Sequence, residues 1–577
     1  MRLTAPLTVL ADHLGYDTGS PQAVVLAATV PVTRVTATLV GEDGTRVPLD
    51  VTGAPEQVDG WTTGRYLRIP FTAPAGTWQV LVGTDAGAAA SAWFTVADEL
   101  LASTTISDVC AYFRASRSSG EIDRKDRHAR FYGDDSGREV DASGGWLDAS
   151  GDFSKFLSHL TYTRTMSPQQ IPLVAWACFA ARDELVRRHP VVGRAHGARL
   201  RDEGLFGCDF LLRFREPGGT FYTAIFDALT KNLEERVVNA PLQDSVRTQR
   251  WQAGFRQGGG LAVAALARAA AQDDPGTHAP EEYVDVAWSV FEHLEEHNLE
   301  YLFDGRESVL DDYCALLAAA ELVAVLPDDD RRGRALGSLR RRVASLDDRY
   351  VAGADGAAGY LRADDEGRPF FHAAEAGLPV VALVRAAEVV ATDERGVRDD
   401  AVVGRARALA LRLARDLLAR TDSVPNPFGY PRQLVQPTGG EPRESFFFPH
   451  DNETGYWWQG ENAGICSSSY AASLVADLPE TDATTAARLR VLATDQLHWV
   501  LGRNPFDSSM LQGRGRRHGA YSPVYQNLPG GILNGITAGF EDESDVDFLP
   551  AGQDAWRWAE QWIPHSGWYL LAVSAAG

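Results

Sequence analysis

The segment DASGGWLDASGDFSKFLSHLTYT, residues 141–163, is unusually rich in glycine and aspartate. Glycine permits backbone angles that other residues avoid, and aspartate side chains hydrogen-bond to the backbone in turns. These residue types predict a tight loop that presents two carboxylates, Asp148 and Asp152, directly after a Gly-Gly-Trp sequence. The loop is therefore the first candidate for a functional site.

Apolar residues from Phe153 to Leu160 recur at helical spacing and predict a helix over residues 152–163. Asp152 would be the N-cap of this helix, and capping alone explains one aspartate at this place. Capping does not explain the second carboxylate, Asp148, which comes four residues earlier. Two carboxylates that hold a water molecule, with a protonated carboxyl group across the sugar, are what glycoside hydrolysis requires.

The sequence GGWLDASGDFSKF, residues 144–156, resembles the GGW-x-DAGD-x-x-KY signature of family 9 glycoside hydrolases, with one extra residue between the aspartates. This family consists of inverting cellulases, and the resemblance implies an (α/α)6 barrel catalytic domain. It also implies that Asp152 is the catalytic base and that Asp148 helps to hold the attacking water. Trp146, in the same motif, is a candidate for substrate binding.

The charge of the chain bears on its partners. The 577 residues carry a formal net charge of −23, and nucleic acids and anionic membranes both need a basic face. We therefore expect neither as a partner. No apolar stretch is long enough to span a bilayer, and the N-terminal sequence lacks a long apolar signal region and a cleavage motif. These features predict a cytoplasmic protein.

The cysteines do not indicate a disulfide or a metal cluster. They are odd in number and scattered, and four lie in apolar helical runs, so buried free thiols are expected. The acidic turns at residues 134–139 and 541–547 lack the spacing of a dedicated calcium loop, although some members of the resembled family bind structural calcium. We expect no metal site and no required cofactor.

Residues 1–98 carry short β-type runs separated by turn signals, as in 23–29 and 66–72, and predict a small antiparallel sandwich. The opening ADHLGYD, residues 11–17, resembles the start of the immunoglobulin-like domain that precedes the catalytic domain in one branch of family 9. Residues 99–577 have helical periodicity instead. Two domains that meet at this boundary also suit the length of the chain.

Twelve amphipathic runs predict helices in the second domain. Long helical stretches joined by loops of uneven length are typical of a closed ring of paired helices with the functional residues on its loops. Twelve is also the number that the implied (α/α)6 barrel requires. The runs are 152–163, 170–189, 196–213, 250–272, 281–297, 309–326, 332–349, 371–392, 399–421, 461–476, 482–502 and 555–575.

The loop from Val424 to Asn462 is rich in aromatic and planar polar side chains. Sugars present apolar faces and a ring of hydroxyl groups, so a sugar site combines flat aromatic rings with hydrogen-bonding groups. Trp457 and Trp458 are candidate sugar platforms, although an extended segment would turn only one of them inward. Glu461 is a further candidate for substrate binding.

Residues 499–523 contain LGRNPF followed by a glycine-rich loop, and they resemble a second segment of family 9. This correspondence implies that Arg516 and His518 bind substrate hydroxyl groups. A basic turn that balances local acids explains Arg516 and its neighbour Arg517 equally well.

The sequence DAWRWAEQWIPHSGWYLLAVSAA, residues 554–576, resembles the closing helix of the family and places Glu560 at the position of the general acid. Trp556, Trp558 and Trp562 surround Glu560 in the sequence, and an aromatic setting raises the pKa of a carboxyl group by desolvation. The alternative is that Glu560 is one more acid on a helix surface.

Together these features predict an inverting glycoside hydrolase whose partner is an oligosaccharide. The absence of an export signal, a linker and an appended binding module favours short β-linked cello- or chito-oligosaccharides and exo action, as in β-glucosidases and β-glucosaminidases. The alternatives are an endo-β-1,4-glucanase, a polysaccharide lyase on a helical barrel, and a non-catalytic sugar-binding protein on the same scaffold.

The sequence does not choose between glucose and glucosamine. If the sugar is glucosamine, an acid near the cleft should pair with its ammonium group, and Glu453, Glu461 and Asp451 are the candidates. The oligomeric state is not predicted.

Overall fold

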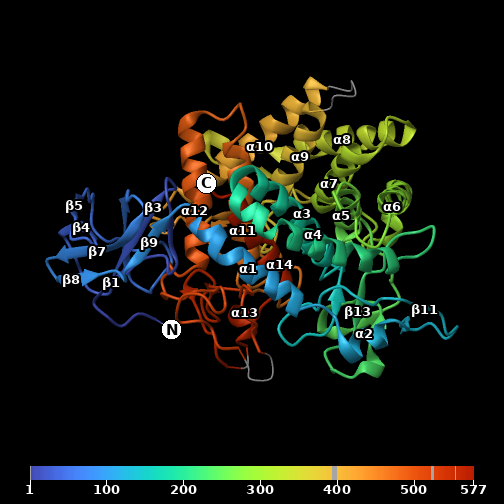
Figure 1. Ribbon diagram of the computed structural model, residues 1–577, viewed down its shortest axis with the longest axis horizontal. Coiled ribbons are helices and arrows are strands. Elements are labelled where there is room, and N and C mark those ends of the chain that lie inside the picture. The colour runs from blue at the N-terminus through green and yellow to red at the C-terminus, as the bar shows by residue number, and fades with distance from the viewer. Residues whose placement is uncertain (1, 393–398, 522–525, 553) are drawn as a thin grey trace.

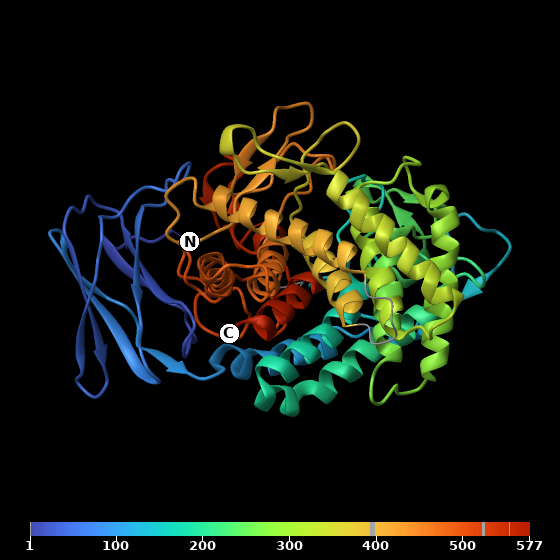
Figure 2. The ribbon, with the colours of Figure 1, turned by 90° about the horizontal axis from the view of Figure 1, so that it is seen from above.

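The computed structural model describes residues 2–392, 399–521, 526–552 and 554–577. Nine strands lie between Leu7 and Ala97, and the rest of the chain is mainly helical. Figures 1 and 2 show the strand-rich region, coloured blue, at one end of the long axis of the molecule and the helices beside it.

The N-terminal strands form two sheets. One has the order β1-β3-β6, the other has the order β2-β9-β7-β4-β5, and β8 pairs with β7. Buried residues of both sheets, such as Leu26 in β3 and Val80 in β7, belong to one hydrophobic cluster, so the sheets share a core. The strands are β1 Leu7–Leu10, β2 Gly15–Asp17, β3 Gln22–Ala28, β4 Val35–Gly41, β5 Arg46–Leu49, β6 Arg65–Phe71, β7 Gly76–Thr84, β8 Gly87–Ala90 and β9 Phe94–Ala97. The predicted sheet region is confirmed, but β2 and β9 pair in parallel rather than antiparallel.

The helical region contains long helices and two short ones. Their bounds are α1 Leu100–Ala115, α2 Gly120–Asp126, α3 Ile171–Arg188, α4 Pro190–Arg213, α5 Gly259–Ala270, α6 Pro280–Tyr301, α7 Val309–Val325, α8 Asp330–Asp348, α9 Leu378–Ala391, α10 Asp400–Thr421, α11 Asn462–Ala476, α12 Ala483–Val500, α13 Trp556–Ala559 and α14 Ile563–Ala575.

Six of the described helices contact one another in a closed cycle. Helices α3, α5, α7, α9, α11 and α14 each contact the next, and α14 contacts α3 again. We call these the inner helices. They are apolar around most of their circumference, as expected for helices that are covered on all sides. Helices α4, α6, α8, α10 and α12 pack outside α3, α5, α7, α9 and α11 in turn, and α1 packs against α14 and α4.

The predicted helix over residues 152–163 is wrong. The chain there forms strand β12, Lys155–Phe156, which pairs with β13, Ala224–Phe226. The ammonium group of Lys155 is fully buried, donates hydrogen bonds to two main-chain carbonyl oxygens and pairs with Asp126 at 2.5 Å. Burial of this charge with its partners overrides the helical spacing of the apolar residues.

Two further elements differ from the prediction. Helix α1 lies at Leu100–Ala115, where no run was predicted, and contacts α14 and α4. The single predicted run 555–575 is divided into α13 and α14, because Glu560 and Trp562 have extended backbone angles. Glu560 therefore lies in a break between two helices.

The long connections precede α3, α5, α11 and α14, so they reach the start of inner helices. They carry short strand pairs rather than further long helices. These are β10 Ala129–Arg130 with β11 Glu139–Val140, β13 with β14 Val237–Val238, β15 Ala240–Pro241 with β16 Arg247–Thr248, β19 Gln433–Val435 with β20 Arg443–Ser445, and β21 Thr537–Ala538 with β22 Val546–Asp547; β17 Tyr350–Val351 pairs with β18 Tyr360–Leu361 before α9.

All five cysteines fall within the described residues and are buried free thiols, as predicted. In the part of the chain that the structure describes, no helix has the length and apolar character needed to cross a bilayer.

Candidate active site

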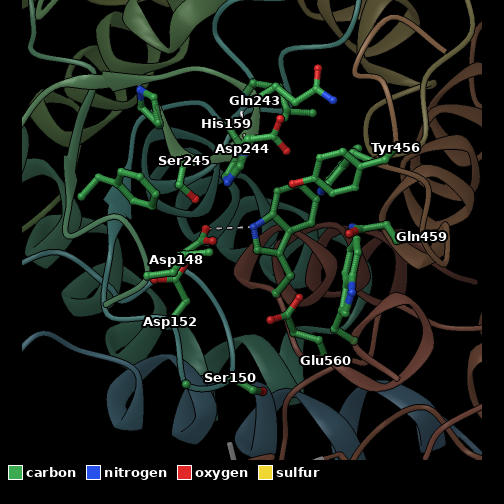
Figure 3. Close-up of a pocket in the computed structure, with 18 of the residues that line it drawn as sticks. Asp148, Ser150, Asp152, His159, Gln243, Asp244, Ser245, Tyr456, Gln459 and Glu560 are labelled. Atoms are coloured by element: carbon green, nitrogen blue, oxygen red, sulfur yellow. Dashed lines mark hydrogen bonds between the residues drawn. The ribbon is translucent and has the colours of Figure 1, made fainter. Parts of the chain in front are cut away.

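A cavity of about 340 Å³ lies among the long connections, and Asp148, Asp152 and Glu560 all line it (Figure 3). Three separate stretches of the chain supply most of its wall: residues 148–162, residues 226–245 and residues 456–459. Tyr521 and, in and after α13, Trp556, Glu560 and Trp562 supply the rest of the wall. The two early aspartates and the late glutamate, which are far apart in the sequence, thus meet at one cavity.

The two aspartates are held by a tight turn. The main-chain nitrogen of Asp148 donates to the oxygen of Ser154 at 2.9 Å, and the nitrogen of Asp152 donates to the oxygen of Ala149 at 3.1 Å. Gly151 has a φ of 76°, in the left-handed region that favours glycine. The carboxylate of Asp152 accepts from the nitrogen of Ser154 at 2.9 Å within this turn, so it does not cap a helix.

Main-chain hydrogen bonds join this turn to the segment that carries Glu560. The nitrogen of Ser150 donates to the oxygen of Gln561 at 2.9 Å, and the nitrogen of Ile563 donates to the oxygen of Asp148 at 3.2 Å. On its other side, the oxygen of Glu560 accepts from the nitrogen of Asn534 at 2.7 Å. The relative positions of the three carboxyl groups are therefore set by the backbone.

Asp148 is buried, and its Oδ1 accepts a hydrogen bond from Nε1 of Trp562 at 2.9 Å. Burial raises the pKa of Asp148 well above its ordinary value, and the nearby charge of Asp152 raises it further. The hydrogen bond from Trp562 opposes this pKa shift because it stabilises the carboxylate. Asp148 thus favours its protonated form when Asp152 is charged.

Burial also raises the pKa of Glu560, to about 8, and the charge of Asp152 acts in the same direction. The amide of Asn534 and the ammonium group of Lys231 oppose this shift. At neutral pH Glu560 is therefore protonated and holds a proton that it can donate into the cavity.

Aromatic rings form part of the wall. The indole of Trp457 lies parallel to the imidazole of His159, with an interplanar angle of 13° and a centroid distance of 6.4 Å. It meets the indole of Trp562 edge-on at 5.7 Å. Flat apolar surface next to acid groups is the combination that a sugar ring requires.

Of the residues predicted to bind substrate, Trp457 reaches the cavity and Trp146 does not. Trp146 is fully buried between Phe113 and Phe206, and its Nε1 donates to Glu203 at 3.3 Å. Its role in the glycine-rich motif is therefore to anchor the loop in the core.

Trp458 and Glu461 also lie outside the set of residues that line the cavity. Trp458 is buried and stacks on His450 with ring centroids 3.9 Å apart. Glu461 is buried and accepts a hydrogen bond from the nitrogen of Phe448 at 2.6 Å. The expectation that only one of the two adjacent tryptophans turns inward matches their placement.

Arg516 and His518 are directed elsewhere. The guanidinium of Arg516 pairs with Asp507 at 2.6 Å, and its main-chain nitrogen donates to Nδ1 of His13 at 3.2 Å, next to the N-terminal sheets. His518 Nδ1 lies 3.1 Å from the oxygen of Ser509. Neither side chain lines the cavity, so the alternative of a basic turn that balances local acids describes Arg516.

The acids expected to pair with an amino sugar are not at the cavity either. Glu453 accepts hydrogen bonds from Thr165, Glu461 is buried as described, and Asp451 is exposed outside the cavity wall. Among the described residues, Asp244 is the acid that lines the cavity in addition to the three candidates.

Sequence reasoning missed several residues that line the cavity. His159 was assigned to a helix, and Lys231 and Asp244 lie in a connection without a recognisable motif. Ala228, Leu229, Lys231, Asp244 and Ser245 all have positive φ, although none is glycine. Such angles arise from tertiary contacts and leave no composition signal, so only the structure locates this part of the wall.

Within the described residues, no group of three or more histidine, cysteine, aspartate or glutamate side chains is placed to hold a metal ion.

Comparison with known proteins gave no match to a family model and no match to a curated protein. Among solved structures, the chain is similar to the endoglucanase CelQ from Clostridium thermocellum, whose structure contains cellotetraose: identity is 14%, the TM-score is 0.47, and the match covers 81% of this chain and 70% of that one. It is also similar to cellobiose 2-epimerase from Spirochaeta thermophila DSM 6192, with 13% identity, a TM-score of 0.41, and coverage of 82% and 94% respectively. Similarity at this level does not assign an activity to the chain.

Proposed function

We propose that the protein is an inverting glycoside hydrolase that cleaves β-linked gluco-oligosaccharides. The observation that carries this proposal is the meeting of Asp148, Asp152 and Glu560 at one cavity, with the pKa of Glu560 raised to about 8. Hydrolysis with inversion needs a protonated carboxyl group on one side of the glycosidic bond and a carboxylate on the other, with room for a water molecule between them.

In the proposed reaction, Glu560 donates its proton to the departing glycosidic oxygen while water attacks the anomeric carbon. Asp152 accepts a proton from this water, the bond between the anomeric carbon and the departing oxygen breaks, and the new C–O bond forms on the opposite face. The elevated pKa of Asp148 and its hydrogen bond from Trp562 favour a role in holding the water. Asp152 is then the carboxylate available as base. The reaction requires no metal and no cofactor.

The cycle of six inner helices with six outer helices supports an (α/α)6 barrel as the catalytic fold. We propose that residues 99–577 form this domain and that residues 1–98 form an immunoglobulin-like sandwich in front of it. Both assignments agree with the sequence resemblance to family 9.

Exo action on short chains is supported by the loops around the cavity. The turn at residues 242–246 contacts the loop that contains Gly455, and a Cβ atom at Gly455 would lie 2.3 Å from Nε2 of Gln243. This contact narrows the cavity on one side, and a volume of about 340 Å³ is at the low end of ligand pockets.

The test is a product profile on soluble β-linked oligosaccharides of glucose and of glucosamine, with the anomer of the first product followed by NMR. Release of single sugars or short products as the inverted anomer is expected, and Asp152→Asn and Glu560→Gln should each abolish it. Cleavage of internal bonds in carboxymethyl-cellulose would favour the endo alternative. Turnover retained in either variant would contradict the assigned roles.

A further inference from the structure

One side of the cavity presents polar groups that the proposed hydrolysis does not use. In Figure 3, His159, Gln243 and Asp244 are drawn on the side of the cavity opposite Glu560. Two of them, His159 and Asp244, offer hydrogen-bonding atoms without a partner among the described residues.

The imidazole of His159 is fixed as a neutral hydrogen-bond donor. Its Nδ1 accepts a hydrogen bond from the main-chain nitrogen of Leu160 at 3.0 Å, so the ring proton lies on Nε2. Burial lowers the pKa of His159 to about 4, which keeps the ring uncharged at neutral pH. The ring is held by Phe156, with centroids 4.4 Å apart, and by the parallel indole of Trp457. Nε2 has no acceptor among the described residues, and His159 lines the cavity.

The carboxylate of Asp244 is the acceptor on the same side. Asp244 lies in the turn between β15 and β16 with a φ of 57°, a left-handed conformation that aspartate tolerates better than most residues. Aspartate in a turn usually bonds its own backbone, but this carboxylate has no hydrogen bond and no ion pair with any described residue. It is exposed at the cavity and available to a ligand.

The position of Asp244 is set by its neighbour. The side chain of Gln243 lies against Gly455 of the facing loop, so closely that only a glycine fits there without displacement of the amide. The main-chain nitrogen of Leu242 also donates to the oxygen of Val246 at 2.7 Å and closes the turn. The turn therefore presents Asp244 from a fixed place.

We propose that His159 and Asp244 form a recognition subsite for a sugar unit on the side of the cavity away from Glu560. Nε2–H of His159 donates to an oxygen of this sugar, and the carboxylate of Asp244 accepts from a hydroxyl or ammonium substituent. The inference rests on the proposed function, because it names the part of the same cavity that selects the saccharide.

The charge of the cavity also selects among saccharides. Four carboxyl groups and one lysine are the acidic and basic groups among the described residues of its wall. Glu560 holds its proton at neutral pH, and the three aspartates of the wall outnumber its one lysine, Lys231. Sugars that carry a carboxylate or phosphate are repelled, whereas neutral and cationic sugars are accepted.

The role of Asp244 is tested by calorimetric binding in the Glu560→Gln background, with three β-linked oligosaccharides whose terminal unit is glucose, glucosamine or glucuronic acid. Addition of Asp244→Asn should weaken binding of the accepted sugars by about tenfold, and binding of the glucuronic acid ligand should improve. A larger loss for glucosamine identifies an ammonium partner, and an equal loss identifies a hydroxyl group. Asp451→Asn, which removes an exposed charge outside the cavity, should change none of these affinities.

His159→Phe keeps a flat ring between Phe156 and Trp457 but removes the donor, and it should weaken binding of all accepted sugars about fivefold. His159→Gln, which restores an amide donor near Nε2, should recover part of this loss. Thermal unfolding of each variant checks that the fold is intact. Unchanged affinities in Asp244→Asn and His159→Phe would overturn the subsite while the hydrolase proposal stands. If no saccharide binds the Glu560→Gln protein and the wild type releases no sugar, the proposed function itself fails and the subsite with it.

Discussion

Nε1 of Trp562 donates a hydrogen bond to Oδ1 of Asp148 at 2.9 Å, and this contact connects the start of α14 to the early aspartate turn. This hydrogen bond stabilises the carboxylate form of Asp148 against the effect of burial. The orientation of Asp148 therefore depends on a side chain that lies 414 residues further along the chain.

Trp562→Phe removes this donor and keeps most of the ring. A buried carboxyl group that loses its partner changes its orientation and its protonation, so kcat should fall by about tenfold with a smaller change in KM. Trp558→Phe is the matched control, because Nε1 of Trp558 is buried and has no hydrogen-bond partner among the described residues. Equal activity in both variants would show that the bond to Asp148 has no part in turnover.

Activity should fall as the pH rises through about 8, because Glu560 must be protonated to act as the acid and its pKa is about 8. Glu461→Gln is the control: burial also raises the pKa of Glu461 to about 8, but Glu461 does not line the cavity. The measurement is a profile of kcat/KM against pH, which reports the ionisations of the free enzyme. The alkaline limb should persist in Glu461→Gln. Its loss in this variant would mean that the limb reports Glu461 and not Glu560.

The same pKa shift predicts an effect of pH on stability. The ordinary pKa of Glu560 is 4.5 and its folded value is about 8, so between these pH values the folded protein binds more protons than the unfolded chain. Glu560 therefore lowers the free energy of unfolding as the pH rises through this window. Glu560→Gln removes this penalty and should stabilise the protein more at about pH 9 than at about pH 5, as measured by denaturant unfolding. An equal change at both values would contradict the shift.

The adjacent tryptophans should give opposite results. Trp457→Ala removes a wall of the cavity and should raise KM by about tenfold with little loss of stability. Trp458 is buried against His450 and Arg557, so Trp458→Ala should lower the free energy of unfolding by about 3 kcal/mol. Substrate kinetics and denaturant unfolding of both variants separate the two roles. The reverse pattern would mean that Trp458 is the sugar platform.

Arg503 joins the N-terminal sheets to the helical region. Its fully buried guanidinium pairs with Asp495 and donates to the oxygen of Ala23 at 3.0 Å. Arg503→Ala leaves a buried carboxylate with one partner fewer and should cost about 3 kcal/mol. Arg516→Ala, which breaks a partly exposed pair with Asp507, should cost less than about 1 kcal/mol and leave turnover unchanged. Loss of activity in Arg516→Ala would restore Arg516 as a substrate-binding residue.

The sequence predicts the fold class better than it predicts the wall of the site. Periodicity locates most helices, because helices such as α7 and α10 need only a consistent apolar pattern. It fails at residues 152–163, where the buried pair of Lys155 and Asp126 decides the local structure. A contact between two residues that are distant in the sequence leaves no periodic pattern, so periodicity cannot predict it.

The candidate carboxyl groups were predicted because they lie in two recognisable motifs, Asp148 and Asp152 in residues 144–156 and Glu560 in residues 554–576. Trp146 lies in one of these motifs as well, yet its side chain is in the core, since a motif fixes residue types and not the direction of a side chain. Asp244 and His159 were missed for the opposite reason. Their place at the cavity depends on turns in which Asp244 and Leu160 have positive φ. The residue types at these positions do not predict such turns.

Helix α14 contacts both α11 and α3, and the same segment carries the main-chain bonds that bring Glu560 to the aspartate turn. Closure of the cycle of inner helices and assembly of the three carboxyl groups therefore depend on the placement of the same segment. Displacement of this segment would remove Glu560 from the cavity and leave the two aspartates without a proton donor opposite them.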